Sequence, residues 1–248
     1  MKKCANPQRP QYGFTLVEIA MVLMIIGLLL GGLIPTLSTQ MESQRINETR
    51  KSLAEIQEAL VGFAISKGRL PCPANPAIAT GQAGAGTERT PPCTGSNSAG
   101  VLPWATLGVN ETDAWGNRYT YHVSSDFADA IASTTYGGCT PSPIPTQASF
   151  GLCSNGSPDV LSAASGGTSV ATNVPVVIVS HGKNSAGAYT QLGTQLSASS
   201  NADEQENSDS SANNDYVSHT PTPNFDDQVV WLANSILLNR MVAAGKLP

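Results

Sequence analysis

Side chains suited to acid–base or nucleophilic chemistry are few in this 248-residue chain. It has three histidines, His122, His181 and His219, and none of them lies in an H-E-x-x-H pattern. The sequence also lacks a G-x-S-x-G elbow, a C-x-x-C pair and a glycine-rich phosphate loop. Ser180 precedes His181, but adjacency in the sequence is no evidence that the serine and histidine side chains face each other as a nucleophile and its base. These observations predict a protein that is not an enzyme.

Cysteines are the next candidates for chemistry. They show no C-x-x-C pair and no histidine at ligand spacing, which disfavours a zinc site. Disulfides in an oxidising compartment are favoured instead, although an odd number in an exported chain would leave one thiol over. The five cysteines are Cys4, Cys72, Cys93, Cys139 and Cys153.

The composition narrows the class of protein. Hydrophobic residues make up 40% of the chain, enough for a folded core, whereas only 12% of residues are charged. The formal net charge is -5, and no basic stretch follows the first few residues. A nucleic-acid-binding protein needs clustered Lys and Arg to neutralise phosphates, so DNA and RNA are poor candidates as partners. The many neutral polar residues favour an exported protein.

The N-terminal segment predicts how the chain meets a membrane. Lys2, Lys3 and Arg9 precede an apolar run at residues 14–34, and the next basic residue is Arg45. A run of this length can cross a bilayer as a helix, which takes ~20 residues. Because the basic residues come first, we expect the leader to stay in the cytoplasm while the rest of the chain is exported.

The junction between the leader and the apolar run carries a specific motif. Residues 13–18 read G-F-T-L-V-E, which resembles the cleavage and methylation motif of the type IV prepilin family. The resemblance implies that a membrane-embedded prepilin peptidase cuts between Gly13 and Phe14. It also implies that the same enzyme methylates the new amino group of Phe14, so that the apolar helix is kept in the mature protein.

Glu18 places a carboxylate inside the apolar run, where an acid is costly and by default has a partner. The prepilin resemblance implies that Glu18 pairs with the amino terminus at Phe14 of a neighbouring subunit, which would set the register of a filament. The alternative is an acid that merely reaches the membrane interface. We therefore expect Glu18 and Phe14 to serve assembly.

Removal of the leader would also take away Cys4 and leave four cysteines, which allow three pairings. We favour disulfides between Cys72 and Cys93 and between Cys139 and Cys153. Each pair closes a short loop rich in Pro, Gly and Ser that would otherwise be poorly held. The alternative is a set of free, buried thiols.

Periodicity beyond the apolar run predicts one long helix and a small sheet. Apolar residues recur at helical spacing through residues 46–63, which extends the helix to residues 14–66 and ends it near Gly68. Strands are expected at residues 118–123, where Tyr and Val alternate with polar residues, and at residues 174–180, a β-branched run.

The remaining segments complete an α+β architecture, pilin-like, with a long, partly transmembrane N-terminal helix packed against a small antiparallel sheet. Residues 68–100 predict a long loop held by a disulfide, and residues 197–223 a surface loop. Residues 227–244 could be a strand followed by a helix, or helix throughout. The expected divisions are a cleaved leader (1–13), a transmembrane and filament-core helix (14–37), the amphipathic half of that helix (38–67) and a periplasmic globular domain (68–248).

Three patches outside the helix are similar to the major pseudopilin of type II secretion systems. They read T-D-A-W-G-N-R-Y at residues 112–119, V-S-H-G-K-N at 179–184 and D-D-Q-V-V-W at 226–231. Ala114 stands where the family has proline, and His181 and Asn184 stand where it varies or has Asp.

This resemblance also implies a calcium site, because the loop before the third patch binds calcium in major pseudopilins. Calcium takes six to eight oxygen ligands, several of them carboxylates. The resemblance reaches Asp226 and Asp227, which are the expected ligands, while the alternative is a solvated acidic loop. No cofactor is otherwise required. Other acids nearby are Asp203, Asp209 and Asp215.

Taken together, the motifs predict a structural subunit of a type IV pilus-like filament, most similar to type II secretion pseudopilins. Expected partners are copies of itself, other pilins or pseudopilins, the prepilin peptidase and the inner-membrane assembly platform. The expected location is the inner membrane, spanned once, with the C-terminal domain in the periplasm. The alternative is a minor or adhesive type IV pilin that binds a surface, DNA or a partner at a filament tip.

Overall fold

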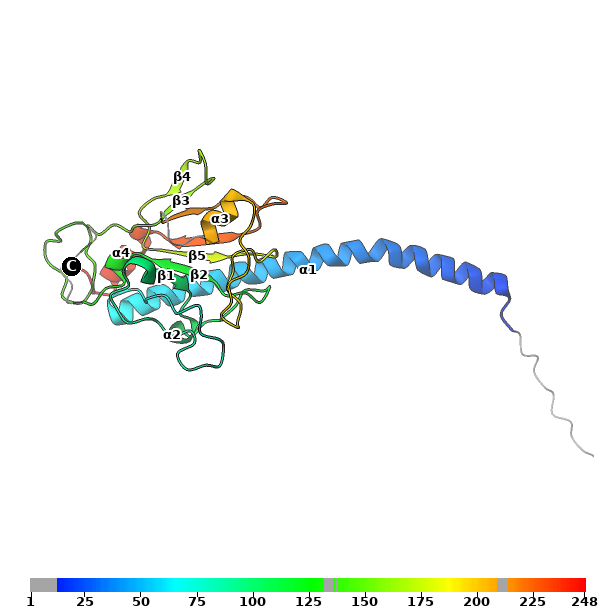
Figure 1. Ribbon diagram of the computed structural model, residues 1–248, viewed down its shortest axis with the longest axis horizontal. Coiled ribbons are helices and arrows are strands. Elements are labelled where there is room, and N and C mark those ends of the chain that lie inside the picture. The colour runs from blue at the N-terminus through cyan, green and yellow to red at the C-terminus, as the bar shows by residue number, and fades with distance from the viewer. Residues whose placement is uncertain (1–12, 132–135, 137, 209–213) are drawn as a thin grey trace, which may run out of the picture. The chain divides into compact units, whose positions relative to one another are not determined.

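The computed structural model describes residues 13–131, 136, 138–208 and 214–248, with the backbone alone for residues 30–38. The chain divides into two compact units, Met1–Gln44 and Arg45–Pro248, which are described separately below. The described secondary structure combines helices with two β-sheets (Figure 1). The α+β fold class predicted from the sequence is confirmed.

One long helix, α1, runs through Leu16–Lys67, close to the predicted residues 14–66. Its end is fixed by Gly68, whose φ is 72°. A Cβ atom at Gly68 would lie 2.1 Å from the carbonyl oxygen of Gln147, so this position requires glycine. The predicted helix end is therefore correct, and the chain turns there into the globular unit.

The globular unit has a four-stranded antiparallel sheet in the order β1-β2-β5-β7. Strands β2 and β5 overlap the two predicted strands. The segment at residues 227–244 forms strand β7 followed by helix α4, which is the first of the two alternatives given for it. The strands are β1 (Ala99–Val101), β2 (Thr120–Val123), β5 (Val176–Ser180) and β7 (Gln228–Leu232), and α4 is Asn234–Ala243.

The predicted apolar stripe of α1 covers one face of this sheet. Leu53, Ile56 and Leu60 are buried in one cluster with Tyr121 and Ile178 of the sheet. Helix α4 joins the same cluster, so the second half of α1 is held by a continuous core within the globular unit. The long helix packed on a small antiparallel sheet is thus as predicted.

A second, three-stranded sheet covers the other face. Its order is β4-β3-β6, with β3 antiparallel to β4 and parallel to β6. Val177 and Val179 of β5 pack against Val160 and Tyr216 of this sheet, so β5 is buried on both faces, as its apolar run suggests (Figure 1). The strands are β3 (Asp159–Leu161), β4 (Ser169–Ala171) and β6 (Asp215–Val217).

The prediction of a surface loop at residues 197–223 is wrong in its described part. This segment contains helix α3 (Ala202–Ser208) and strand β6. Glu204 and Asn207 of α3 are buried, as is Tyr216 of β6. The physical reason is that Asn207 exchanges side-chain hydrogen bonds with the main chain of Val217, which ties α3 to the edge of β6. Short elements are α2 (Trp104–Leu107) and the 3-10 turns at Gly95–Asn97 and Ser125–Phe127.

Candidate functional sites: the N-terminal motif and an acidic cluster

Gly13 and Phe14 are accessible in the N-terminal unit. A Cβ atom built on Gly13 would meet no atom within 4 Å, and the Phe14 side chain is 78% exposed. Both residues lie before the first residue of α1, in backbone without regular structure. The bond between them is therefore open to an enzyme and is not protected by a helix.

Thr15 and Glu18 form a reciprocal cap at the start of α1. The backbone N–H of Glu18 donates to Oγ1 of Thr15 at 3.2 Å, and the backbone N–H of Thr15 donates to Oε2 of Glu18 at 3.4 Å. This arrangement satisfies two backbone donors that a helix start leaves without partners. Glu18 thus stabilises the start of α1, and its carboxylate is bound to the backbone of Thr15, the second residue after the predicted cut.

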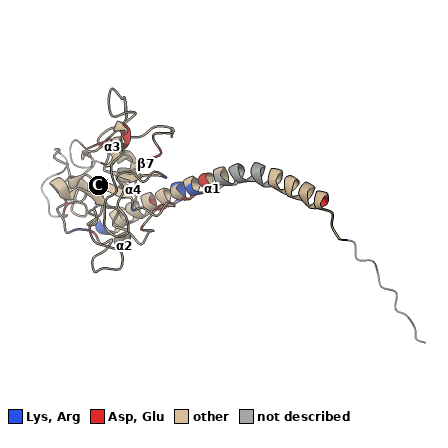
Figure 2. Ribbon diagram, turned by 45° about the vertical axis from the view of Figure 1, so that its right-hand side comes forward, with Lys and Arg blue, Asp and Glu red and all other residues tan. Residues whose placement is uncertain are grey.

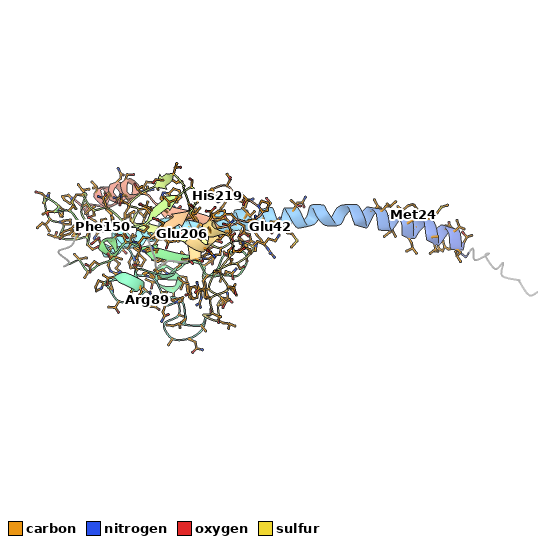
Figure 3. All side chains as sticks on the ribbon, turned by 45° about the horizontal axis from the view of Figure 1, so that its top comes forward. Met24, Glu42, Arg89, Phe150, Glu206 and His219 are labelled. Carbon is orange, nitrogen blue, oxygen red and sulfur yellow. A yellow bond between two sulfur atoms is a disulfide. The ribbon has the colours of Figure 1, made fainter. Side chains whose placement is uncertain are left out.

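The first segment of α1 exposes its apolar side chains all round. The large apolar residues from Leu16 to Leu29 are between 44% and 87% exposed, and they point outward on both sides of the helix near Met24 in Figure 3. In Figure 2 the described part of this segment is uncharged except for Glu18 at its start. Within the described residues, no helix meets the combined requirements of length and apolar character for a membrane span.

Residues 8–34 match the family model of the prokaryotic N-terminal methylation motif. The chain carries the type IV prepilin signature. No curated protein and no solved structure matches the chain. The signature implies a membrane-anchored precursor that is processed by a prepilin peptidase and assembled with other pilins, as a structural subunit of a pilin- or pseudopilin-type filament.

The globular unit of this prepilin-type chain contains one cluster of three carboxylates among its described residues. Donor oxygens of Glu204, Asp226 and Asp227 all lie within 4.8 Å of one another. Helix α3 supplies Glu204, and the two aspartates come directly before β7. The structure therefore brings together both predicted calcium ligands, and it adds Glu204, which the sequence analysis did not single out.

Part of each carboxylate is held by the protein, and part is left open. Asp226 Oδ2 accepts the N–H groups of Lys183 and Asn184 at 2.8 and 2.9 Å, and Asp227 Oδ2 accepts from the Asn207 side chain at 2.8 Å. The second oxygen of each aspartate, Oδ1, is buried and has no hydrogen-bond partner among the described groups. Buried carboxylate oxygens without partners are costly, so the cluster is prepared for a proton or a cation.

Burial also changes the acid–base properties of the cluster. It raises the pKa of Asp227 to about 8, against the hydrogen bond from Asn207, and the charges of Glu204 and Asp226 raise this pKa further. Burial likewise raises the pKa of Asp226. His181 lies with Nδ1 3.8 Å from Asp227 Oδ1, but burial lowers the pKa of this histidine to about 4, so it stays neutral near pH 7. The cluster therefore carries uncompensated negative charge when its acids ionise.

The turn after β5 positions Asp226 and depends on one glycine. Gly182 has a φ of 57°, and a Cβ atom there would lie 2.4 Å from the carbonyl oxygen of Asp226. The close approach allows the next two N–H groups to reach the Asp226 carboxylate. Asn184 also donates through its side chain to Glu204 Oε1 at 2.7 Å, which links the turn to α3.

The other acids named from the sequence do not join the cluster. Asp203 lies 3.2 Å from Nε2 of His219, and Asp215 stands opposite Asp159 in the pairing of β3 with β6. Asp209 lies outside the described residues. The sequence pointed to Glu204 only through the acidic composition of its segment. The spacing of the acids in that segment does not show which of them is buried.

The histidines have structural contacts. His122 Nδ1 lies 2.9 Å from the hydroxyl of Tyr216, which joins the two sheets, and His181 Nε2 lies 2.8 Å from Thr120 Oγ1. Ser180 donates its hydroxyl proton to Asp113 Oδ2 at 2.6 Å, so its partner is this acid and not His181. Among these described contacts, Ser180 is not paired with a histidine in the way that a nucleophile is paired with its general base in a catalytic triad, since the hydroxyl that His181 contacts is that of the buried Thr120.

Both predicted disulfides, Cys72–Cys93 and Cys139–Cys153, are present. They differ in accessibility: Cys72 and Cys93 are fully buried in the main core, whereas Cys153 is exposed and Cys139 half-buried. We expect mild reductant at native pH to open Cys139–Cys153 first, because a thiolate must reach the sulfur it attacks. Opening Cys72–Cys93 as well should lower the unfolding free energy by roughly 3 kcal/mol in the chain-entropy model.

Differential alkylation followed by peptide mapping checks this order of reduction. Cys139 and Cys153 should acquire the label while Cys72 and Cys93 remain linked. Simultaneous labelling of all four cysteines in the folded protein would contradict the difference in accessibility.

Proposed function

We propose that the protein is a pseudopilin of a type II secretion system, a filament subunit that is drawn from the inner membrane to help move folded proteins out of the periplasm. The single observation that carries this proposal is the N-terminal motif, with an accessible Gly13–Phe14 junction just before a helix whose first apolar side chains are exposed all round. Such a surface needs lipid before assembly and other helices after it.

The acidic cluster supports the pseudopilin branch over a minor or adhesive pilin. Two of its members, Asp226 and Asp227, belong to the patch that is similar to major pseudopilins, and the structure places them with Glu204. The turn that holds Asp226 is the second such patch, residues 179–184. Two segments far apart in sequence that share this similarity thus meet at one place.

Deletion of the gene in the source bacterium tests the function. We expect proteins that normally leave through the outer membrane to accumulate folded in the periplasm, while pilus-dependent motility and surface attachment continue. The opposite result, normal export with lost attachment, would favour the adhesive pilin.

We further propose that the acidic cluster binds calcium. The fit rests on three carboxylates with donor atoms within 4.8 Å and on two buried carboxylate oxygens without described partners, a hard, oxygen-rich donor set. A bound calcium ion would supply the positive charge that the cluster lacks. Glu204, Asp226 and Asp227 would hold it, and they would thereby tie α3 to the start of β7.

Chelation tests the calcium site on a purified fragment spanning residues 42–248. Because calcium would bind only the folded state, saturating calcium should raise the melting temperature by several degrees, corresponding to about 2.7 kcal/mol at a hundredfold excess over Kd. The double variant Asp226→Ala, Asp227→Ala should lose this shift. The matched control Asp126→Ala, Asp129→Ala removes two acids elsewhere and should keep it. Equal melting temperatures of the wild type in calcium and in chelator, at constant ionic strength, would reject the site.

A further inference from the structure

Strand pairing brings a histidine beside the acidic cluster. Strand β5 ends at Ser180, which pairs with Gln228 at the start of β7. In an antiparallel pair, the residue after one partner lies opposite the residue before the other, so His181 comes to lie opposite Asp227. The His181 side chain is fully buried. An imidazole therefore lies inside the protein next to one of the three clustered carboxylates.

The Nδ1 atom of His181 faces an oxygen that it cannot reach with a hydrogen bond. It lies 3.8 Å from Asp227 Oδ1, and neither atom has a hydrogen-bond partner among the described groups. The other ring nitrogen, Nε2, lies 2.8 Å from the hydroxyl of Thr120, which holds the ring from its other side. Because a hydrogen bond takes ~2.7–3.2 Å between its heavy atoms, a shared proton does not close the gap between Nδ1 and Oδ1.

A metal ion fits this gap better than a proton. Zinc binds histidine nitrogen and carboxylate oxygen at ~2.0–2.2 Å, so two such atoms 3.8 Å apart can both bind one ion that lies between them, at a wide angle. Calcium takes oxygen ligands, whereas imidazole nitrogen suits zinc and other transition ions. A histidine at this position therefore changes the class of ion that the cluster favours.

The carboxylates supply the rest of a four-ligand set. Glu204, Asp226 and Asp227 have donor oxygens within 4.8 Å of one another, and Oδ1 of Asp226 is buried without a described partner. His181 is not a member of this group of three, and among the described carboxylates Asp227 is the one within ion-pair distance of it. An ion on the Asp227 side of the cluster can therefore bind the imidazole as well. Zinc sites in proteins commonly have four ligands, and one nitrogen with three oxygens reaches that number without sulfur.

We propose that His181 is a nitrogen ligand of the acidic cluster, and that the site binds a divalent transition ion of the zinc type more tightly than it binds calcium. The inference rests on the proposed cation site and deepens it, because it names the residue that selects the ion and the class of ion selected. A bound ion would join the end of β5, helix α3 and the residues before β7 at one centre.

Zinc and calcium titrations test the preference on the full-length protein, purified in detergent and stripped of metal with a chelator. We expect the dissociation constant for zinc to be at least about tenfold lower than that for calcium. His181→Asn replaces the nitrogen ligand with a carboxamide, whose oxygen calcium accepts, and should lower the ratio of zinc to calcium affinity by more than about tenfold. The matched control His219→Gln removes the half-buried histidine that lies 3.2 Å from Asp203, and it should keep the wild-type ratio.

X-ray absorption at the zinc edge identifies the ligands directly. The wild type loaded with a single equivalent of zinc should show the outer-shell scattering of one imidazole, which His219→Gln should keep and His181→Asn should lose. If His181→Asn does not fold, the spectra of the wild type and of His219→Gln still decide. Zinc bound through oxygen alone, zinc that binds no more tightly than calcium, or an imidazole signal lost in His219→Gln would overturn the proposal. If calcium binds without a preference for zinc, the calcium site stands and this inference fails; if neither ion binds, both fail.

Discussion

Gly13→Leu should leave the precursor uncut, with the leader of residues 1–13 still attached. The reason is steric and lies in the peptidase, because the chain itself has room for a larger residue: a Cβ atom at Gly13 meets nothing within 4 Å. A site shaped to a glycine rejects a four-carbon side chain, and we expect the cleaved fraction to fall at least about a hundredfold. The uncut protein should remain in the inner membrane.

Intact-mass spectrometry of membrane and filament fractions measures the result. Gly13→Ala is the matched control, because a single methyl group changes the same position while adding far less bulk, and it should be cut more completely than the leucine variant. Assembled wild-type protein that still contains Met1 to Gly13, or that begins after Leu33, would show that the cut is elsewhere.

The elements that the sequence predicted well are those with a long, uninterrupted pattern. Helix α1 follows from apolar residues at helical spacing, and Gly68 ends it where the sequence indicates. Strand β5 (Val176–Ser180) follows from the β-branched run at residues 174–180, because short runs rich in valine and isoleucine favour a strand over a helix. The disulfides were predictable because each pair closes a short loop.

The missed elements are short and are stabilised by polar contacts. Helix α3 has seven residues and no apolar stripe, and it is held by Glu204 and Asn207, whose side chains turn inward. Strand β6 has three residues and pairs in parallel with β3, more than fifty positions earlier in the chain. Sequence periodicity reports apolar burial, so polar residues that are buried through hydrogen bonds give no such signal.

Only two of the three carboxylates of the candidate cation site were predictable from the sequence. Asp226 and Asp227 could be found through a local resemblance, since they are neighbours in one patch. Glu204 joins them only because α3 folds back, through Asn207 and Asn184, onto the turn that ends at β7. A ligand from a distant segment depends on tertiary contacts. The sequence of a solvated acidic loop, which makes no such contacts, would show the same acidic composition.

Glu18→Ala and Glu18→Gln should both be processed normally and should both lower filament yield more than about tenfold. We expect this because the negative charge of Glu18 is the proposed partner of the Phe14 amino group in the next subunit, and neutral replacements cannot pair with it. The structure makes the two variants informative, since Glu18 also caps α1 through Thr15. Glutamine keeps an oxygen that accepts from the Thr15 N–H, whereas alanine removes it.

Quantification of sheared filaments against total membrane protein separates these two roles. Equal losses in both variants assign the effect to charge. Near-normal assembly of Glu18→Gln together with failure of Glu18→Ala would instead assign it to the helix cap, whose loss costs about 1 kcal/mol and loosens the start of α1. Normal assembly of both variants would reject a role for Glu18 in the filament and leave its carboxylate with the cap alone.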